Sequence, residues 1–259
     1  MGVVDGMLLK AANLYNRSKF DEALELLKKW EKPILETKDH VRISQLYALE
    51  ANSYNSLYFT QKSRNCLLEA KKHAEKIVDD NTRYNNLAKV NMILSNTFEV
   101  NQDVKKNFDS ILYYRKKAYE IQSKIVGGGI LKTGAVIQAS AIGNIFLKVD
   151  KIDSGKVYFE RALSLIKQHQ LEKFAFSTYI GLADIHFKNK RLDSALRYYL
   201  NAYQLAVKIE NTSNIKDSYQ KLYRTYMELG DSEKSLFYLK KYSSVADSLA
   251  QAGKNATKT

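Results

Sequence analysis

The 259-residue chain contains little proline and little glycine. Pro33 is the single proline, so long helices can run through most of the chain without a break. Glycine occurs only eleven times, and three of the glycines are adjacent at positions 127–129. This scarcity, together with abundant Leu, Ala, Lys, Glu and Tyr, favours helix over strand.

Cysteine and long apolar runs are also scarce. Cys66 is the only cysteine, which excludes an internal disulfide and a cysteine-based zinc cluster. No stretch approaches the roughly 20 apolar residues that span a bilayer. Residues 1–5 have neither the basic region nor the apolar core of a signal peptide. We therefore expect no membrane segment, and a cytoplasmic location, or a periplasmic one if the chain is a trimmed sensor domain.

Positive charge is in excess, because the chain has 41 basic and 28 acidic residues and thus a net charge of +13. A positive surface favours acidic partners, including nucleic acid. The basic residues are spread along the chain with no dense block, which is typical of a solvated surface. We therefore do not expect nucleic acid as a partner of this domain.

The main positive feature is an internal repeat. Segments in which an apolar residue or Gly is followed by Asp precede several helix-forming stretches, and Asp near a helix start caps free N–H groups. Each repeat has an anchor residue, usually small, and these anchors are Ala23, Ser63, Ile111, Gly155, Ala195 and Ser235. Their spacings are 40, 48, 44, 40 and 40 residues. Seven residues after them stand Trp30, Ala70, Ala118, Ala162, Ala202 and Tyr242. Small residues every second turn let a neighbouring helix approach closely.

A second helix pattern precedes most anchors. Twelve residues before them are the small residues Ala11, Ala51, Gly143 and Ala183, and three residues later the bulky residues Leu14, Tyr54, Phe146 and His186. The last repeat breaks the rule, because Tyr223 occupies the small position, and the third repeat needs about four extra residues near 101–107. Each repeat is thus a helix, a turn and a second helix. Neither helix can bury its apolar stripe alone, so the repeats must stack.

This spacing and this small/large pattern resemble the tetratricopeptide repeat (TPR) family over residues 4–250. The resemblance implies an all-α fold, a right-handed superhelical solenoid of about six TPR-like hairpins. They are expected at 4–36, 39–78, 82–126, 131–169, 171–209 and 212–250, with residues 251–259 as a disordered tail. The period of about 40 exceeds the 34 residues usual in the family. It is similar to that of the long-helix TPR sensor regions of bacterial (Bacteroidetes-type) transcriptional regulators.

Motifs for catalysis and for metal or cofactor binding are missing from the sequence. A phosphate loop requires Gly directly before the Lys132-Thr133 pair and again five residues earlier, where this chain has Leu131 and Val126. No two of the four histidines are spaced i, i+4, and no His-Glu-x-x-His motif exists. Cys66 has no sequence-evident base, and no Gly-x-Ser-x-Gly elbow occurs. We expect no enzyme activity, no metal and no cofactor.

The resemblance also places certain first-helix positions on the concave groove. The position directly after the small residue is occupied by Ala12, Asn52, Asn96, Asn144, Asp184 and Arg224. An Asn amide both donates and accepts, so a ladder of Asn would hold an extended peptide backbone. Apolar groups one turn further, at Leu147, Phe187 and Met227, would take side chains of the guest. Positive charge in the C-terminal half suits an acidic guest or a free carboxylate.

The predicted peptide- or partner-binding groove therefore consists of Asn52, Asn55, Asn96, Asn144, Lys148, Asp184, Lys188, Lys221 and Arg224. The alternative for the asparagines is that they cap neighbouring turns or fill polar gaps. We predict a protein- or peptide-binding domain, the ligand- or partner-sensing part of a bacterial regulatory protein. The open alternatives are a constitutive scaffold for complex assembly, an RNA-binding helical repeat, and a homodimer formed through the apolar first helix with Met7, Leu8 and Leu9.

Overall fold

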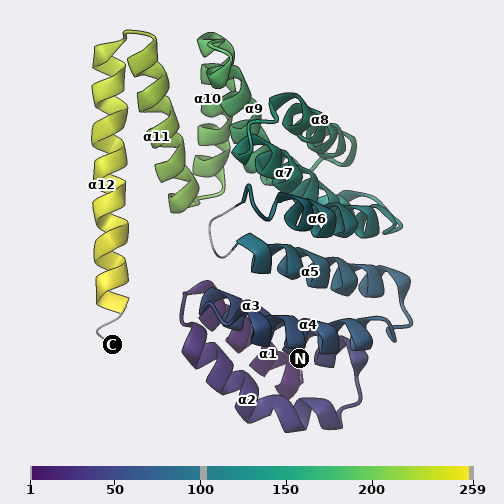
Figure 1. Cartoon of the computed structure of the whole chain (residues 1–259). Helices are drawn as coiled ribbons and strands as arrows, with labels where there is room; N and C mark the ends of the chain where they lie inside the picture. Colours follow the sequence, from purple (N-terminus) through teal and green to yellow (C-terminus); the bar gives the residue numbers. More distant parts are fainter. Residues whose placement is uncertain (1, 100–103, 257–259) are drawn as a thin grey trace. The chain divides into compact units, whose positions relative to one another are not determined.

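Helices make up the chain almost entirely (Figure 1). The computed structural model describes residues 2–99 and 104–256. Within these ranges it contains twelve α-helices, two short 3₁₀ helices and no strand. The α-helices are α1 (Val3–Asn16), α2 (Phe20–Glu36), α3 (His40–Ser56), α4 (Thr60–Ala74), α5 (Asp80–Glu99), α6 (Phe108–Ser123), α7 (Thr133–Lys148), α8 (Ile152–His169), α9 (Phe176–Lys188), α10 (Leu192–Lys208), α11 (Thr212–Glu228) and α12 (Ser232–Ala256). The 3₁₀ helices are η1 (Gly129–Lys132) and η2 (Glu172–Phe174). The predicted all-α fold is confirmed.

Successive helices pair into hairpins at the predicted small residues. Ser63 of α4 is fully buried, and its hydroxyl donates to the Ala51 carbonyl of α3 at 2.8 Å. A Cβ atom on Gly155 of α8 would lie 3.1 Å from the carbonyl oxygen of Gly143 in α7. The Ser235 hydroxyl of α12 likewise donates to the Tyr223 carbonyl of α11, at 3.1 Å. The anchor positions are therefore where the two helices of a hairpin approach most closely, as the pattern predicts.

The connections between helices repeat with a period of their own. A residue with positive φ occurs every 20 residues in two series, which are Ser18, Lys38 and Tyr58, and then Asp150, Gln170, Lys190, Glu210 and Gly230. Such a residue ends one helix and turns the chain into the next. The series is interrupted between Tyr58 and Asp150, where the third hairpin has longer connections. Only Gly230 of the eight is the residue type that adopts this conformation without strain.

Contacts divide the chain into two compact units, residues 1–138 (unit 1) and 139–259 (unit 2). Unit 1 contains α1 to α6, η1 and the first turns of α7. Unit 2 contains the rest of α7 and α8 to α12. The single solenoid domain over residues 1–250 stays a prediction, and each unit is described by itself.

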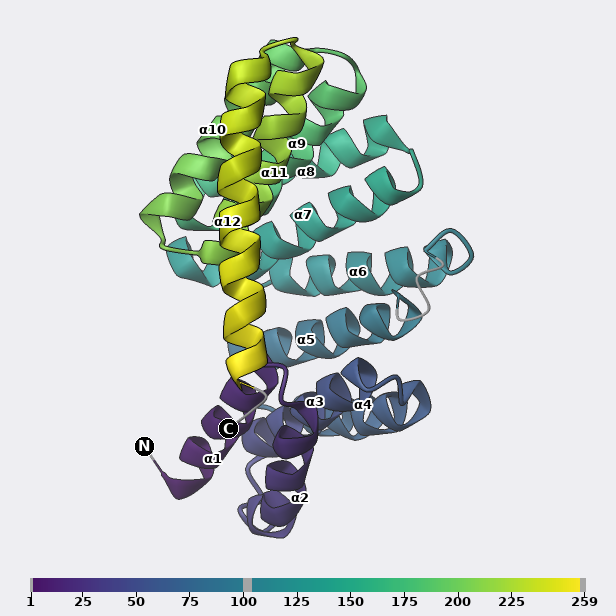
Figure 2. The same cartoon turned by 90° about the vertical axis from the view of Figure 1, so that its left-hand side faces the viewer.

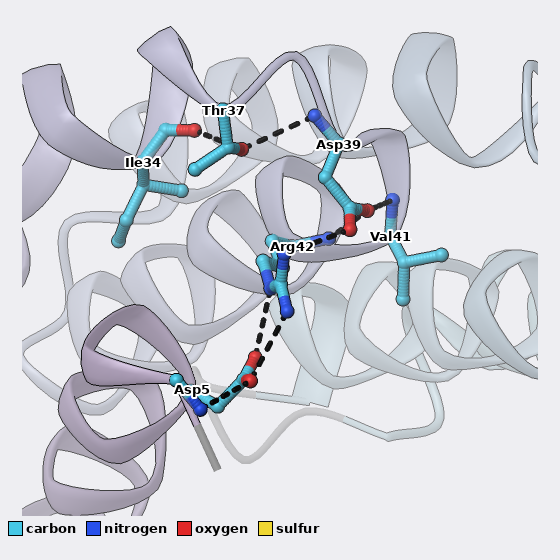
Figure 3. A network of polar contacts seen from close by, with 7 residues as sticks. Asp5, Ile34, Thr37, Asp39, Val41 and Arg42 are labelled. Carbon is cyan, nitrogen blue, oxygen red and sulfur yellow. Dashed lines mark hydrogen bonds and ion pairs between the residues drawn. The ribbon is translucent and has the colours of Figure 1, made fainter.

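In unit 1 a polar network joins the first and second hairpins (Figure 3). Arg42 of α3 donates from Nε and Nη2 to the two carboxylate oxygens of Asp5 in α1, at 2.8 and 3.1 Å. These hydrogen bonds lower the pKa of the Asp5 carboxyl. Asp39 caps α3 by accepting from the backbone N–H groups of Val41 and Arg42. The same residues thus start α3 and tie it to α1.

One helical segment departs from the expectation about apolar runs. Among the described residues, Gly129–Lys148 is long and apolar enough, by length and composition, to cross a membrane. Half of that window is nevertheless buried inside the structure, including Val136, Ile142 and Phe146. Uniform apolarity of this kind is typical of a helix that packs on several sides.

The C-terminal helix extends into the predicted tail. Helix α12 continues to Ala256, so its last turns include residues 251–256. Ala, Gln and Lys are good helix formers, and they extend an existing helix without a new nucleation step. Residues 257–259 lie outside the described part of the chain.

Candidate functional site

Unit 2 contains a pocket of about 580 Å³ formed by three successive hairpins. Its lining consists of Asn144, Leu147 and Lys148 of α7, Asp184, Phe187 and Lys188 of α9, Tyr199 of α10, and Lys221 and Arg224 of α11. Six of the nine predicted groove residues belong to this lining, and so do two of the three apolar residues expected beside them, Leu147 and Phe187, whereas Met227 does not. The structure thus brings together the C-terminal part of the predicted site.

The pocket follows from spacing within and between helices. The lining residues of α7 and α9 fall at i, i+3 and i+4, which places them on one face of a helix. Asn144, Asp184 and Arg224 are spaced by 40 residues, so each occupies the same place in its hairpin. Stacking of the hairpins then aligns these three positions along one surface.

Asp184 is the electrostatic centre of the pocket. Lys221 Nζ lies 2.7 and 2.9 Å from its two carboxylate oxygens. The buried Tyr199 hydroxyl donates to the same carboxylate. Burial, and next the neighbouring Asp184 charge, raise the pKa of Tyr199. Tyr199 therefore stays protonated and remains a donor, and the carboxylate is held in one place by two helices other than its own.

The pocket has an excess of positive charge, because four basic side chains face one carboxylate in its lining. Lys188 forms an ion pair with Asp150 at 2.6 Å. Arg224 is exposed, and its Nε donates to the Tyr223 hydroxyl at 3.4 Å, a contact that raises the pKa of the guanidinium further. Among the described residues Arg224 has no carboxylate partner. It is thus placed to receive an anionic group from outside.

Apolar and amide groups complete the lining. Leu147 and Phe187 are half-buried and expose part of their surface to the pocket. The Asn144 amide donates to the Ser177 hydroxyl at 3.2 Å in an exposed position. The exposed Arg224 guanidinium thus lines the same pocket as the partly apolar surface of Leu147 and Phe187.

The other three predicted residues belong to unit 1. Asn52 and Asn55 are half-buried on α3, and the side-chain oxygen of Asn55 is buried without a hydrogen-bond partner among the described residues. Asn96 of α5 accepts a hydrogen bond from Arg115 of α6. This contact commits the Asn96 oxygen to an internal network. The ladder of asparagines across the repeats stays a prediction.

Arg115 is the residue at the centre of that network. It is only 9 % exposed, and it also contacts Ser95, Glu99 and Gln138. Burial lowers its pKa, although Glu99 opposes the effect. The network is a polar cluster inside unit 1, and it fits the alternative of a filled polar gap for Asn96 alone.

Unit 1 nevertheless shows how an Asn amide of this chain pairs with the backbone N–H and C=O of a single residue. The Asn81 side chain donates to the Val126 carbonyl at 3.0 Å and accepts from the Val126 N–H at 2.9 Å. This two-way pairing is the one proposed for the groove asparagines. Here it fixes the segment after α6 to the start of α5.

Two histidines that the sequence does not connect lie together. The Nδ1 atoms of His40 (α3) and His73 (α4) are 3.0 Å apart. Burial, and next the neighbouring His40, lower the pKa of His73. Among the residues that the structure describes, no group of three or more His, Cys, Asp or Glu is arranged to hold a metal ion.

The repeat pattern predicts neither the place of Tyr199 in the pocket nor the contact of Arg115 with Asn96. Both are on second helices, where aromatic and long side chains are expected to fill the core. A signal for Tyr199 exists in retrospect, because Asp184 is an acidic residue at a half-buried position and requires donors.

Comparison with known proteins supports the fold. No family model matches the chain, and no curated protein sequence matches it. The solved structures similar to it include BtubC (BKLC) from P. vanneervenii, with a TM-score of 0.67, 12% identity, and coverage of 96% of this chain and 93% of that one. Another is the STAND protein with a tetratricopeptide repeat sensor from Pyrococcus horikoshii, with a TM-score of 0.72, 22% identity, and coverage of 95% and 37%.

A Rap protein in complex with Competence and Sporulation Factor is also similar, with a TM-score of 0.64, 14% identity, and coverage of 95% of this chain and 75% of that one. Identities this low show the fold alone. Together with the repeated hairpins, they establish that this chain has a tetratricopeptide-like helical repeat fold.

Proposed function

We propose that the chain is a protein- or peptide-binding domain, and that the unit 2 pocket receives a segment with an acidic group beside an apolar side chain. The observation that carries the proposal is the pocket lining, where Arg224 lacks a carboxylate partner among the described residues and stands with Leu147 and Phe187. A free C-terminal carboxylate or an acidic side chain would pair with the guanidinium. The apolar neighbour would bury surface against Leu147 and Phe187.

The similar structures give this proposal independent support at the level of the fold. One is a Rap protein complexed with Competence and Sporulation Factor, and another is a STAND protein whose tetratricopeptide repeats are named as its sensor. We infer the same broad role here, as the sensing part of a bacterial regulatory protein that acts in the cytoplasm. The present chain corresponds to 37% of the STAND protein, so an effector on another segment or chain fits this role.

The test is a binding measurement with a defined peptide panel. Ten-residue fluorescent peptides would carry Phe or Leu at the last position and end either as a free acid or as an amide, and a further set would place Glu in the interior. We expect the free-acid or Glu peptides to bind, and Arg224→Glu to weaken that binding about tenfold or more, because it replaces attraction with repulsion.

Lys167→Glu is the matched control. It makes the same change of charge on an exposed face of α8, outside the pocket lining. Equal binding of acidic and neutral peptides, or equal losses in the two variants, would contradict a pocket-specific anion site.

Two measurements separate the alternatives. A sensor changes conformation when the peptide binds, whereas a constitutive scaffold does not, so hydrogen exchange with and without bound peptide distinguishes them. RNA binding through the basic surface would weaken steeply as salt rises and would compete with the acidic peptides.

A further inference from the structure

The outer face of α12, defined here as Leu236, Leu239, Lys240, Ser243 and Asp247, is exposed along its length. The spacings of three, four and four residues place Leu236, Leu239, Ser243 and Asp247 on one side of the helix. Figure 2 looks onto α12 within unit 2, and no other helix lies in front of it. Helix α11 covers the opposite side, where Tyr238 stacks on Tyr226.

The equivalent faces of α8 and α10 are covered by the next hairpin in each case. Phe159, Tyr199 and Leu239 are spaced by 40 residues and occupy the same position on α8, α10 and α12. Phe159 is fully buried, and its ring lies where a Cβ atom on Gly181 of the next hairpin would be. Tyr199 is 1 % exposed and lies beneath Lys221 of the next hairpin. Leu239 is 39 % exposed.

The other positions of the face agree with this assignment. Tyr203 of α10 meets Tyr219 of α11, with ring centroids 5.3 Å apart. Forty residues later the same place holds Ser243, which is exposed. A serine there removes bulk where a partner helix would cross, so a helix can approach α12 more closely than α11 approaches α10.

The charges on the face favour a second copy of the same helix. Lys240 and Asp247 lie on either side of Ser243, and neither has an ion-pair partner among the described residues. In an antiparallel pair of α12 helices that cross at Ser243, Lys240 of one copy falls within one residue, about 1.5 Å along the axis, of Asp247 of the other. The two-fold symmetry then forms this ion pair twice.

We propose that two copies of this chain associate through the outer faces of α12, antiparallel and crossing at Ser243. Leu236 and Leu239 are covered in this dimer as their counterparts on α10 are covered by the next hairpin. One helix from each copy makes a contact smaller than the roughly 1,600 Å² of a standard interface, so a dissociation constant in the micromolar range is expected. This dimer forms through α12, whereas the homodimer expected from the sequence forms through the first helix.

Sedimentation velocity over a series of concentrations tests the association. We expect wild type to show a reversible monomer–dimer equilibrium. Leu239→Glu should weaken the dimer at least about tenfold, because it places a carboxylate of each copy in the interface beside Asp247 of the other. Leu68→Glu is the matched control, since Leu68 is an exposed leucine of α4 and should leave the equilibrium unchanged. Monomer at every concentration, or an equal dimer in Leu239→Glu and wild type, would overturn the proposal.

Charge exchange tests the antiparallel register. Lys240→Asp places two carboxylates together at each contact, and Asp247→Lys places two ammonium groups together, so each single change should weaken the dimer. The double variant restores both ion pairs with reversed sign and should restore the dimer. Failure of the double variant to recover would exclude this register.

Cross-linking tests the crossing point. Ser243→Cys should form an intermolecular disulfide under mild oxidation, because a residue on a two-fold axis meets its own copy. Ser244→Cys, one position around the helix, should not. Wild type should not cross-link either, because Cys66 is held in unit 1, where burial raises the pKa of its thiol to about 12. Equal cross-linking of the two variants would contradict a crossing at Ser243.

Discussion

The packing of Phe159 gives the sharpest test of how the hairpins stack. Its ring is fully buried between α7 and α9, against a glycine on each side. A Cβ atom built on Gly181 would lie 2.1 Å from Cζ and 2.2 Å from Cε1 of the ring. A Cβ atom on Gly143 would lie 2.8 Å from the same ring. A shift of the ring away from α9 therefore brings it closer to α7, and the reverse.

Gly181→Ala has two opposite effects on the free energy of unfolding. Alanine is favoured over glycine within a helix by about 1 kcal/mol. Overpacking of a close-packed core costs about 1–3 kcal/mol, and the upper end applies where the displaced side chain has no free direction. We expect a net loss of about 2 kcal/mol in the stability of unit 2.

Urea unfolding followed by the helical circular dichroism signal measures this change. Gly6→Ala is the control, because nothing lies within 4 Å of its added Cβ atom, and it should raise stability by up to about 1 kcal/mol. In a Phe159→Leu background, the smaller side chain leaves room, so Gly181→Ala should cost little or become stabilising. A Gly181→Ala protein as stable as wild type would refute this account of the stacking.

Three other perturbations test the electrostatics and the turns. Lys28→Met should destabilise the fold, because Glu50 is fully buried and Lys28 Nζ is its ion-pair partner at 3.0 Å. Burial raises the pKa of Glu50 above its value in the unfolded chain, so ionisation of Glu50 lowers the free energy of unfolding as pH rises above about 4.5. The loss of stability in Lys28→Met, measured by urea unfolding, should therefore be larger at pH 8 than at pH 4. Gln170 and Gly230 have φ values of 54° and 77°, a region that glycine adopts without strain. Gln170→Gly should therefore raise the free energy of unfolding by about 1 kcal/mol, and Gly230→Ala should lower it by about 1 kcal/mol. Scanning calorimetry would show these changes as a higher and a lower thermal midpoint. A thiol reagent should modify Cys66 slowly in the native protein and rapidly in urea, since partial burial raises the pKa of the thiol to about 12.

The hairpins were predictable because their determinants are local and repeated. Gly143 and Gly155 stand twelve residues apart, and pairs of small residues at this spacing occur in four of the six hairpins. The helix ends follow as well, since the chain turns every 20 residues in the regular repeats. The third hairpin was less predictable, because its longer connections break the period on which the alignment depends.

The candidate site was predictable to the extent that it follows the same period. Asn144, Asp184 and Arg224 were named from their equivalent places, and the structure gathers them at one pocket. Asn96 has the same place in its hairpin but is hydrogen-bonded to Arg115, nineteen residues away on α6. A contact of that kind depends on which side chain the facing helix presents, and nothing in the repeat pattern of one helix specifies it.

The proposed α12 dimer and the proposed peptide pocket are both inferred by comparing equivalent positions of successive hairpins. The position of Leu239 is buried in the two preceding hairpins, where Phe159 and Tyr199 occupy it, so the exposure of Leu239 suits contact with a further helix. The pocket position changes from Asn144 to Asp184 and Arg224 along the repeats, so we expect it to bear on what the pocket selects. The first kind of position therefore predicts association of the chain with a copy of itself, and the second predicts what its pocket selects. Loss of the dimer in Leu239→Glu with peptide binding unchanged, and the reverse in Arg224→Glu, would establish that the two functions are carried by separate helix faces of unit 2.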